Sequence, residues 1–243
     1  MQILFTRSRT CRSAAASCTL LALLLQAACQ TYAPGPGPGA AALPPAPPLP
    51  VQGSTHLSVD SDASELRILV YRGGPLAQFG HNHVILAHGL QGDVYLARHW
   101  RESGFRLRIP VQDLEVDPPA ARREEGAGFA TQPSAQAITG TRSNMLGPAV
   151  LDAGQFPDII IRSLAISGSR QSPAIRVRIT LHGVSRDLTL PVSLQLDDSR
   201  IDVHGTAELL QSDFGITPFS VMGGGLRVQD RLLIRFHLVA SRG

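Results

Sequence analysis

The stretch from residue 156 to residue 192, FPDIIIRSLAISGSRQSPAIRVRITLHGVSRDLTLPV, decides the fold. Apolar and polar residues alternate from Ile175 to Leu181 and again from Leu188 to Leu196, with Gly183 between the two runs. Alternation with a period of two is typical of strands that bury one face. Glycine between two such runs indicates the tight turn of a hairpin. The stretch therefore predicts long antiparallel strands.

The same alternation recurs on both sides of this stretch. It is found at Phe105–Ile109, at Ile201–Ala207 and at Ile234–Leu238, and we count about eight such runs beyond residue 53. This number of half-buried strands is too large for a small α+β domain and is typical of a closed antiparallel barrel or a sandwich. We therefore predict an all-β fold, an antiparallel barrel of about eight strands.

One interval, residues 118–146, breaks this rhythm. Ala, Arg, Glu and Gln replace the β-branched residues there. The composition predicts a short helical insertion, with one helix over Ala120–Glu125 behind a Pro-Pro pair and a second helix over Ser134–Met145. Gly140 lies in the middle of the second helix, where glycine weakens helical structure.

The N-terminus has the features of a secretory signal peptide over residues 1–29. Arginines but no acidic residues precede the apolar run Leu20–Leu25, and small residues and Cys29 follow it. The run is too short for a permanent membrane-spanning helix, which needs roughly 20 residues. Leu25–Cys29 resembles a lipoprotein cleavage box, although Gln26 stands where an aliphatic residue is favoured. We predict lipidation of Cys29 and a membrane-anchored lipoprotein in the bacterial periplasm, with ordinary signal cleavage as the alternative.

Two further segments follow the leader. Residues 30–53 are rich in proline and glycine, a composition that forms a linker and no packed core. Residues 54–241 suit a single domain, and all three cysteines lie before residue 30, so this domain must be held by its apolar core without a disulfide. The formal net charge of +3 comes from the three leader arginines. The mature chain is therefore neutral, which argues against a nucleic-acid partner.

Five short motifs, in this order and spacing, resemble the YceI-like family of secreted, lipocalin-like β-barrels that bind polyisoprenoid lipids. They are Phe79–His83, Asn144–Leu146, Gln155–Asp158, Thr180–Val184 and Asp213–Ile216. The resemblance extends over nearly all of residues 55–240. It departs from the family pattern at Met145-Leu146-Gly147, where a His-Leu-Arg turn is usual.

The resemblance implies a lipocalin-like barrel with a long apolar tunnel and a helical insertion that covers one opening. Its ligand would be a polyisoprenoid, a quinone or an acyl chain, bound without a cofactor for carriage or sequestration in the bacterial envelope. Members of the family can pair, which makes a homodimer a further implied partner. The residues implied to contact lipid, each with an ordinary structural role as the alternative, are Phe79, His81, His83, Met145, Phe156, Phe214, Phe219 and Met222.

His81 and His83 are the sharpest polar feature. Residues i and i+2 of a strand share a face, so the two imidazoles could bind one metal ion. His88 has the wrong parity to be a third ligand and the domain has no cysteine, so we assign no metal site. Three alternatives stay open for the pair: a metal-binding protein or metal-dependent enzyme, a polar contact to a lipid head group, and a hydrogen-bonded structural pair. A structural or stress-linked protein with a filled barrel is the remaining alternative to lipid binding.

His182, Ser185 and Asp187 superficially resemble a hydrolase triad. Gly183 places them at a hairpin turn, which does not orient a base toward an exposed nucleophile. The sequence contains no GxSxG or HExxH motif, and SxxK requires a lysine, which the chain lacks. We therefore predict no enzyme and no catalytic residue. The glycine run Gly223–Gly225 is interpreted as a loop or a strand bulge.

Overall fold

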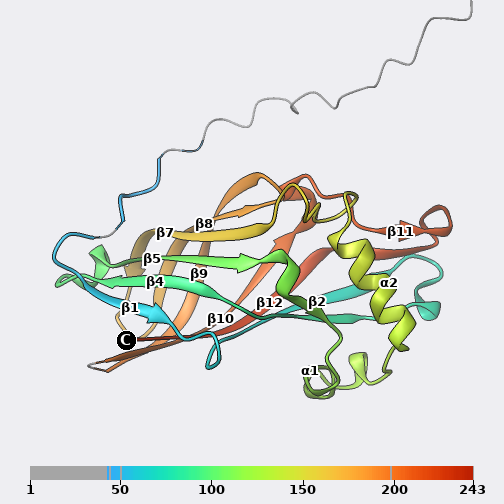
Figure 1. Cartoon of the computed structure of the whole chain (residues 1–243), viewed down its shortest axis with the longest axis horizontal. Coiled ribbons are helices and arrows are strands. Elements are labelled where there is room, and N and C mark those ends of the chain that lie inside the picture. The colour runs from blue at the N-terminus through green and yellow to red at the C-terminus, as the bar shows by residue number, and fades with distance from the viewer. Residues whose placement is uncertain (1–42, 44, 50, 198, 243) are drawn as a thin grey trace, which may run out of the picture. The chain divides into compact units, whose positions relative to one another are not determined.

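The structure is a computed structural model that describes residues 43, 45–49, 51–197 and 199–242 (Figure 1). Within these residues, 12 strands form one antiparallel sheet. The strands are β1 (Thr55–Val59), β2 (Glu65–Gly73), β3 (His83–Ala87), β4 (Gln91–Leu96), β5 (Gly104–Pro110), β6 (Leu114–Val116), β7 (Asp158–Gly168), β8 (Pro173–Leu181), β9 (Val184–Leu196), β10 (Arg200–Leu210), β11 (Ser220–Val221) and β12 (Leu226–Ser241). Short 3₁₀ helices connect several of them: η1 (Ala77–Phe79), η2 (Trp100–Glu102), η3 (Val111–Asp113), η4 (Ala127–Phe129), η5 (Gln211–Phe214) and η6 (Met222–Gly224).

Eight of these strands close into a barrel. Their order is β1-β4-β5-β7-β8-β9-β10-β12, and β1 pairs with β12 through Ser58↔Ser241 and Val59↔Ala240. Closure of the ring satisfies the backbone groups that an open sheet would leave along its edges. The predicted all-β, antiparallel barrel of about eight strands is confirmed.

Three walls of the barrel are long strands with an interruption. β1 and β2 both pair with β12. On their other side, β4 pairs with β1 and β3 pairs with β2. β5 then pairs with β4, and β6 pairs with β3. Ser64, in the interruption between β1 and β2, accepts a hydrogen bond from the N–H of Val239 at 2.9 Å and donates to its carbonyl at 3.3 Å. When each broken strand is counted once, neighbours in the barrel are neighbours in the sequence, which is an up-and-down topology.

The hairpin between β8 and β9 turns at His182 and Gly183, as the sequence predicts. Both residues have positive φ angles, 52° and 72°, which are the angles of a two-residue turn matched to the strand twist. A Cβ at Gly183 would also lie 2.6 Å from the ring of Phe156. Glycine is therefore required at this turn both for its conformation and for the space it leaves.

Both predicted helices are present within one residue of their expected bounds. They are α1 (Pro119–Glu124) and α2 (Ala135–Leu146). The hydroxyl of Ser134 caps α2 by accepting from the N–H of Ala137 at 3.2 Å, and Gly140 does not break the helix. α2 lies at the same end of the barrel as β11 (Figure 1), and its residues Ile138 and Met145 pack against the apolar core.

The first part of the insertion covers the outside of the barrel. Leu69 on β2 and Val84 on β3 are fully buried, although the residues next to them in each strand line the barrel interior. They pack with Ala121 of α1 and Phe129 of η4 in a cluster of their own. The helical segment therefore exists where two strands present apolar side chains on their outer face.

Part of the predicted linker packs with the barrel. The compact unit begins at Leu43, and the guanidinium of Arg162 on β7 donates a hydrogen bond to the carbonyl of Pro47. Leu49 lies against Gly104 on β5, where an added Cβ would meet it at 2.8 Å. The end of this proline-rich segment is thus fixed to β5 and β7.

The predicted signal peptide, residues 1–29, and residues 30–42 of the predicted linker lie outside the described residues. Lipidation of Cys29 therefore stays a prediction. Among the residues that the structure does describe, no helix is both long and apolar enough to cross a membrane.

Two glycines should respond in opposite directions to the same substitution. A Cβ at Gly140, on the surface of α2, meets nothing within 4 Å, so Gly140→Ala should raise the free energy of unfolding by about 0.5–1 kcal/mol. A Cβ at Gly205 on β10 would lie 2.3 Å from the ring of Phe236. Gly205→Ala should lower the free energy of unfolding by about 1–3 kcal/mol through overpacking. Urea denaturation of both variants checks the signs, and equal effects would contradict the difference in free space around the two glycines.

Candidate functional site

The barrel encloses a cavity of about 520 Å³. Inward-facing side chains of every wall line it, and most of them are aliphatic; examples are Leu107, Ile161, Val177, Val192 and Ile234. Pockets for drug-sized ligands have volumes of roughly 300–1,000 Å³ and are mainly apolar. The size and the lining suit one apolar chain.

Polar lining groups are confined to the two ends of the cavity. At the end formed by η1, β11 and α2, which we call the helical end, they include Arg72, His81, Asn144 and Arg227. The opposite end, near η2 and the loop between β7 and β8, has Arg170. The cavity is therefore an apolar tube with charged or polar groups where it meets water.

Five of the residues predicted to contact lipid line this cavity. They are Phe79, His81, His83, Met145 and Phe219, and all lie at the helical end. Phe79 in η1 is 71% exposed and forms part of the rim. Met145 is contributed by α2, so the helical insertion supplies part of the cavity wall.

The other three predicted residues lie elsewhere. The ring of Phe156 packs edge-on against His182, with ring centroids 4.9 Å apart. Phe214 is 1% exposed and belongs to the packed core beside Ile216. Met222 in η6 is 75% exposed. None of these three residues lines the cavity.

The lipid-contacting residues predicted from the sequence are aromatic, histidine and methionine side chains near the motifs, and they do not include the aliphatic wall. The signal for that wall was in the sequence: the apolar positions of each alternating run, such as Val177 and Ile179, are the ones that face the cavity. The alternation does not show whether the inward-facing side chains fill the centre of the barrel. It therefore predicts a barrel without predicting a void.

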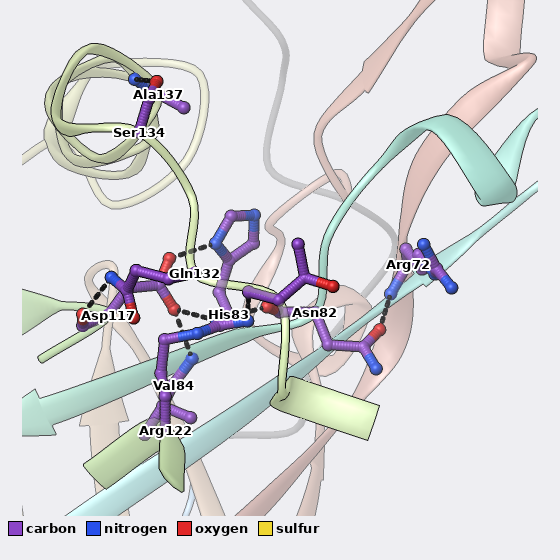
Figure 2. A network of polar contacts seen from close by, with 10 residues as sticks. Arg72, Asn82, His83, Val84, Asp117, Arg122, Gln132, Ser134 and Ala137 are labelled. Atoms are coloured by element: carbon purple, nitrogen blue, oxygen red, sulfur yellow. Dashed lines mark hydrogen bonds and ion pairs between the residues drawn. The ribbon is translucent and has the colours of Figure 1, made fainter. Parts of the chain in front are cut away.

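His83 is held at the helical end by a buried carboxylate. Figure 2 shows its ring pointing toward Asp117, with Nδ1 2.6 Å from Oδ2. The side chain of Asp117 is fully buried, and its other oxygen, Oδ1, accepts from the N–H of Val84 at 2.9 Å and from Arg122 at 2.5 Å. Because a carboxylate only accepts, Nδ1 of His83 carries the proton and Nε2 is left for another partner.

Arg122 ties this network to the helical insertion. Its guanidinium, almost completely buried, also donates to the carbonyls of Asn82 at 2.7 Å and Thr131 at 2.5 Å. Asn82 in turn donates from its amide to the carbonyl of Gly128 at 2.9 Å. These bonds connect the start of β3 with the loop that leads to α2 (Figure 2). Neither Asp117 nor Arg122 was predicted from the sequence as a site residue.

His81 and His83 do not share a strand face, because β3 begins only at His83. Their ring centroids are 6.5 Å apart, and Nδ1 of His83 is already used by Asp117. Burial lowers the pKa of His81 below its usual 6.5, and the nearby His83 and Arg122 lower it further. Within the described chain, this pair is not part of a group of three metal-ligating side chains. The geometry thus favours a hydrogen-bonded residue, His83, beside a neutral one, His81, at the cavity rim.

The pH dependence of stability tests the charge of Asp117. Burial alone would raise its pKa, but the bonds from His83, Val84 and Arg122 outweigh burial and hold the pKa below its usual 3.8. A carboxylate whose pKa is lower in the folded than in the unfolded state stabilises the fold above the unfolded-state pKa, and the effect is lost as the pH falls through the folded-state value. Denaturation curves should show wild type losing more stability than Asp117→Asn below about pH 4. Parallel curves would contradict an ionised Asp117.

The residues that resemble a hydrolase triad are engaged separately. Asp187 forms an ion pair with Arg178 at 2.7 Å, and Ser185 shares a hydrogen bond with Thr180 at 2.8 Å. The ring of His182 packs against that of Phe156. Within the described residues, His182, Ser185 and Asp187 are therefore not joined in a hydrogen-bonded triad.

The sequence and the fold both match known proteins. Residues 77–240 match the family model of the YceI-like domain, which is more than half of the chain. No curated protein sequence matches significantly. Among solved structures, the chain is similar to BcnA of Burkholderia cenocepacia, with 16% identity and a TM-score of 0.57 over 75% of this chain and 99% of that one.

The chain is also similar to a second solved structure. That structure is a polyisoprenoid-binding domain from Saccharophagus degradans implicated in plant cell wall breakdown, with 13% identity and a TM-score of 0.53 over 77% of this chain and 98% of that one. At such identities the structural likeness shows a shared fold alone.

Proposed function

The chain belongs to the YceI-like family, and from this premise we propose that its barrel binds one apolar lipid chain, a polyisoprenoid, a quinone or an acyl chain. The family resemblance noted in the motifs is confirmed. The observation that carries the proposal is the cavity of about 520 Å³ with its aliphatic lining. A barrel filled by its own side chains, the structural alternative, would lack such a space.

An aliphatic tube binds an apolar chain through the burial of apolar surface alone, without any catalytic group. Each methylene transferred from water to an apolar site contributes roughly 0.8 kcal/mol, so a chain of about ten carbons supplies most of the free energy of binding. Polar groups then act only where a head group emerges. At the helical end these are Arg72, His81 and Nε2 of His83. The proposed activity is therefore binding, for carriage or sequestration, and not catalysis.

Exposed apolar groups at the helical end support exchange with a membrane. Phe79 of η1 and Met222 of η6 are 71% and 75% exposed. The two segments are joined by the hydrogen bond from the N–H of Leu76 to the carbonyl of Gly225, at 2.8 Å. An apolar rim beside an apolar tube offers a lipid a path that avoids water. Anchoring through Cys29 in the periplasm would hold this barrel near its source of lipid.

Native mass spectrometry of the full chain purified from a bacterial envelope tests the proposal. A stoichiometric mass that disappears on organic extraction, and that lipid analysis identifies as a prenyl, quinone or acyl compound, is expected. Protein that is empty after purification and takes up none of these lipids from vesicles would overturn it.

A further inference from the structure

Two histidines and an aspartate come together on the outer face of the barrel, away from the cavity. His204 on β10 lies directly opposite His237 on β12 in the strand register. Asp202 precedes His204 by two residues and therefore points to the same face of β10. Ile201 and Val203 line the cavity, so the face that carries Asp202 and His204 is the outer one.

The three side chains are already close to one another. The rings of His204 and His237 are stacked, with centroids 4.1 Å apart and planes 9° apart. Nε2 of His237 lies 2.5 Å from Oδ1 of Asp202. One nitrogen of each ring and one carboxylate oxygen lie within 4.8 Å of one another, and across the part of the chain that is described no other three metal-ligating side chains do so.

We propose that Asp202, His204 and His237 bind a divalent transition-metal ion, for which Zn²⁺ is the best match. Zinc takes imidazole nitrogen and carboxylate oxygen at about 2.0–2.2 Å in tetrahedral geometry, which sets neighbouring donor atoms roughly 3.4 Å apart. The donor atoms start within 4.8 Å of each other, and the stacked rings must turn out of parallel so that one nitrogen of each points to the same ion. Three protein ligands leave the fourth position to water or to an external donor.

The surroundings of the three residues favour this use. Oδ2 of Asp202 accepts a hydrogen bond from Nε of Arg200 at 2.7 Å, so the carboxylate is held in place by one oxygen while the other faces His237. Outer hydrogen bonds of this kind orient metal-ligating carboxylates. The His204 side chain forms no hydrogen bond with any described residue, so its ring nitrogens are available to bind a metal ion. The charge of Arg200 opposes a bound cation, so the affinity should lie below that of closed structural zinc sites.

Two other surface histidines provide matched controls. His56 lies 2.7 Å from Asp93, and His88 lies 2.7 Å from Glu115, in each case from Nε2 to a carboxylate oxygen. Both pairs have the same chemistry as His237 with Asp202, but neither has a second imidazole in reach, among the described residues. Removal of either histidine tests whether a single histidine–carboxylate pair is enough.

The experiment is calorimetric titration of the untagged full chain with zinc chloride. One Zn²⁺ per chain is expected, and His204→Ala and His237→Ala should each weaken binding at least about tenfold, because each removes one of three ligands. His56→Ala and His88→Ala should leave the affinity unchanged. Cobalt(II) serves as a second probe: its tetrahedral visible absorption should appear with wild type and disappear in the same two variants.

Circular dichroism of each variant establishes that the barrel remains folded. The absence of saturable zinc binding to wild type would overturn the proposal. So would zinc binding that is lost in His83→Ala and kept in His204→Ala, because the ion would then sit at the cavity rim. The proposal does not rest on lipid binding, since zinc itself is the readout and the site lies on the opposite face of β10 from the cavity.

Discussion

The variant Ala207→Trp is expected to purify without lipid. Ala207 lies on β10 and lines the cavity with a side chain of a single carbon. An indole at this position projects into the cavity, which is the space that the lipid chain needs. Lipid affinity should fall at least about a hundredfold, because most of the buried methylene surface is lost, each methylene being worth roughly 0.8 kcal/mol.

This variant should lose lipid binding without losing stability. The indole buries apolar surface that the empty cavity leaves uncovered, so the melting temperature of lipid-free protein should stay the same or rise. The matched control is Thr206→Trp, because Thr206 is the preceding residue and is exposed on the outer face of β10. That control should retain its lipid. Mass spectrometry that finds the wild-type amount of lipid in Ala207→Trp would show that the lipid binds elsewhere.

The barrel itself was predictable from local pattern. Each strand buries one face, so the alternation from Ile175 to Leu181 identifies both the strand and its inward side chains without any knowledge of its partners. The turn at Gly183 follows from the same stretch, since few residues other than glycine adopt its φ of 72°. The helices α1 and α2 were predictable because the alternation stops over residues 118–146.

The candidate sites depend on register and on distant contacts, which local pattern does not contain. His81 and His83 were expected on one strand face, but the strand begins at His83. The partner of His83 is Asp117, which lies 34 residues away and in the sequence is only an acidic residue before two prolines. His204 meets His237 only because β10 and β12 pair in one particular register. Such pairings follow from the whole fold.

Asp117→Ala is expected to be the most destabilising single change at the helical end. It leaves the guanidinium of Arg122, which is only 2% exposed, without its carboxylate. Breaking a buried ion pair by removing one partner costs about 3–5 kcal/mol, because the remaining charge is buried and uncompensated. Urea denaturation followed by circular dichroism should show this loss. Asp187→Ala, on the outer face, removes a carboxylate from a solvent-accessible pair and should cost much less.

A double variant tests whether the stability loss of Asp117→Ala comes from the unpaired charge of Arg122 or from lost packing. If the cost of Asp117→Ala arises from the unpaired Arg122, then Asp117→Ala combined with Arg122→Met should recover a large part of the lost stability, because an apolar side chain of similar length needs no counter-ion. If the two losses simply add, the ion pair is not the cause and the contacts of each side chain with the loop before α2 matter more. A dominant ion pair requires His83→Ala to cost less than Asp117→Ala, since the loss of His83 leaves Asp117 still paired with Arg122 and the N–H of Val84.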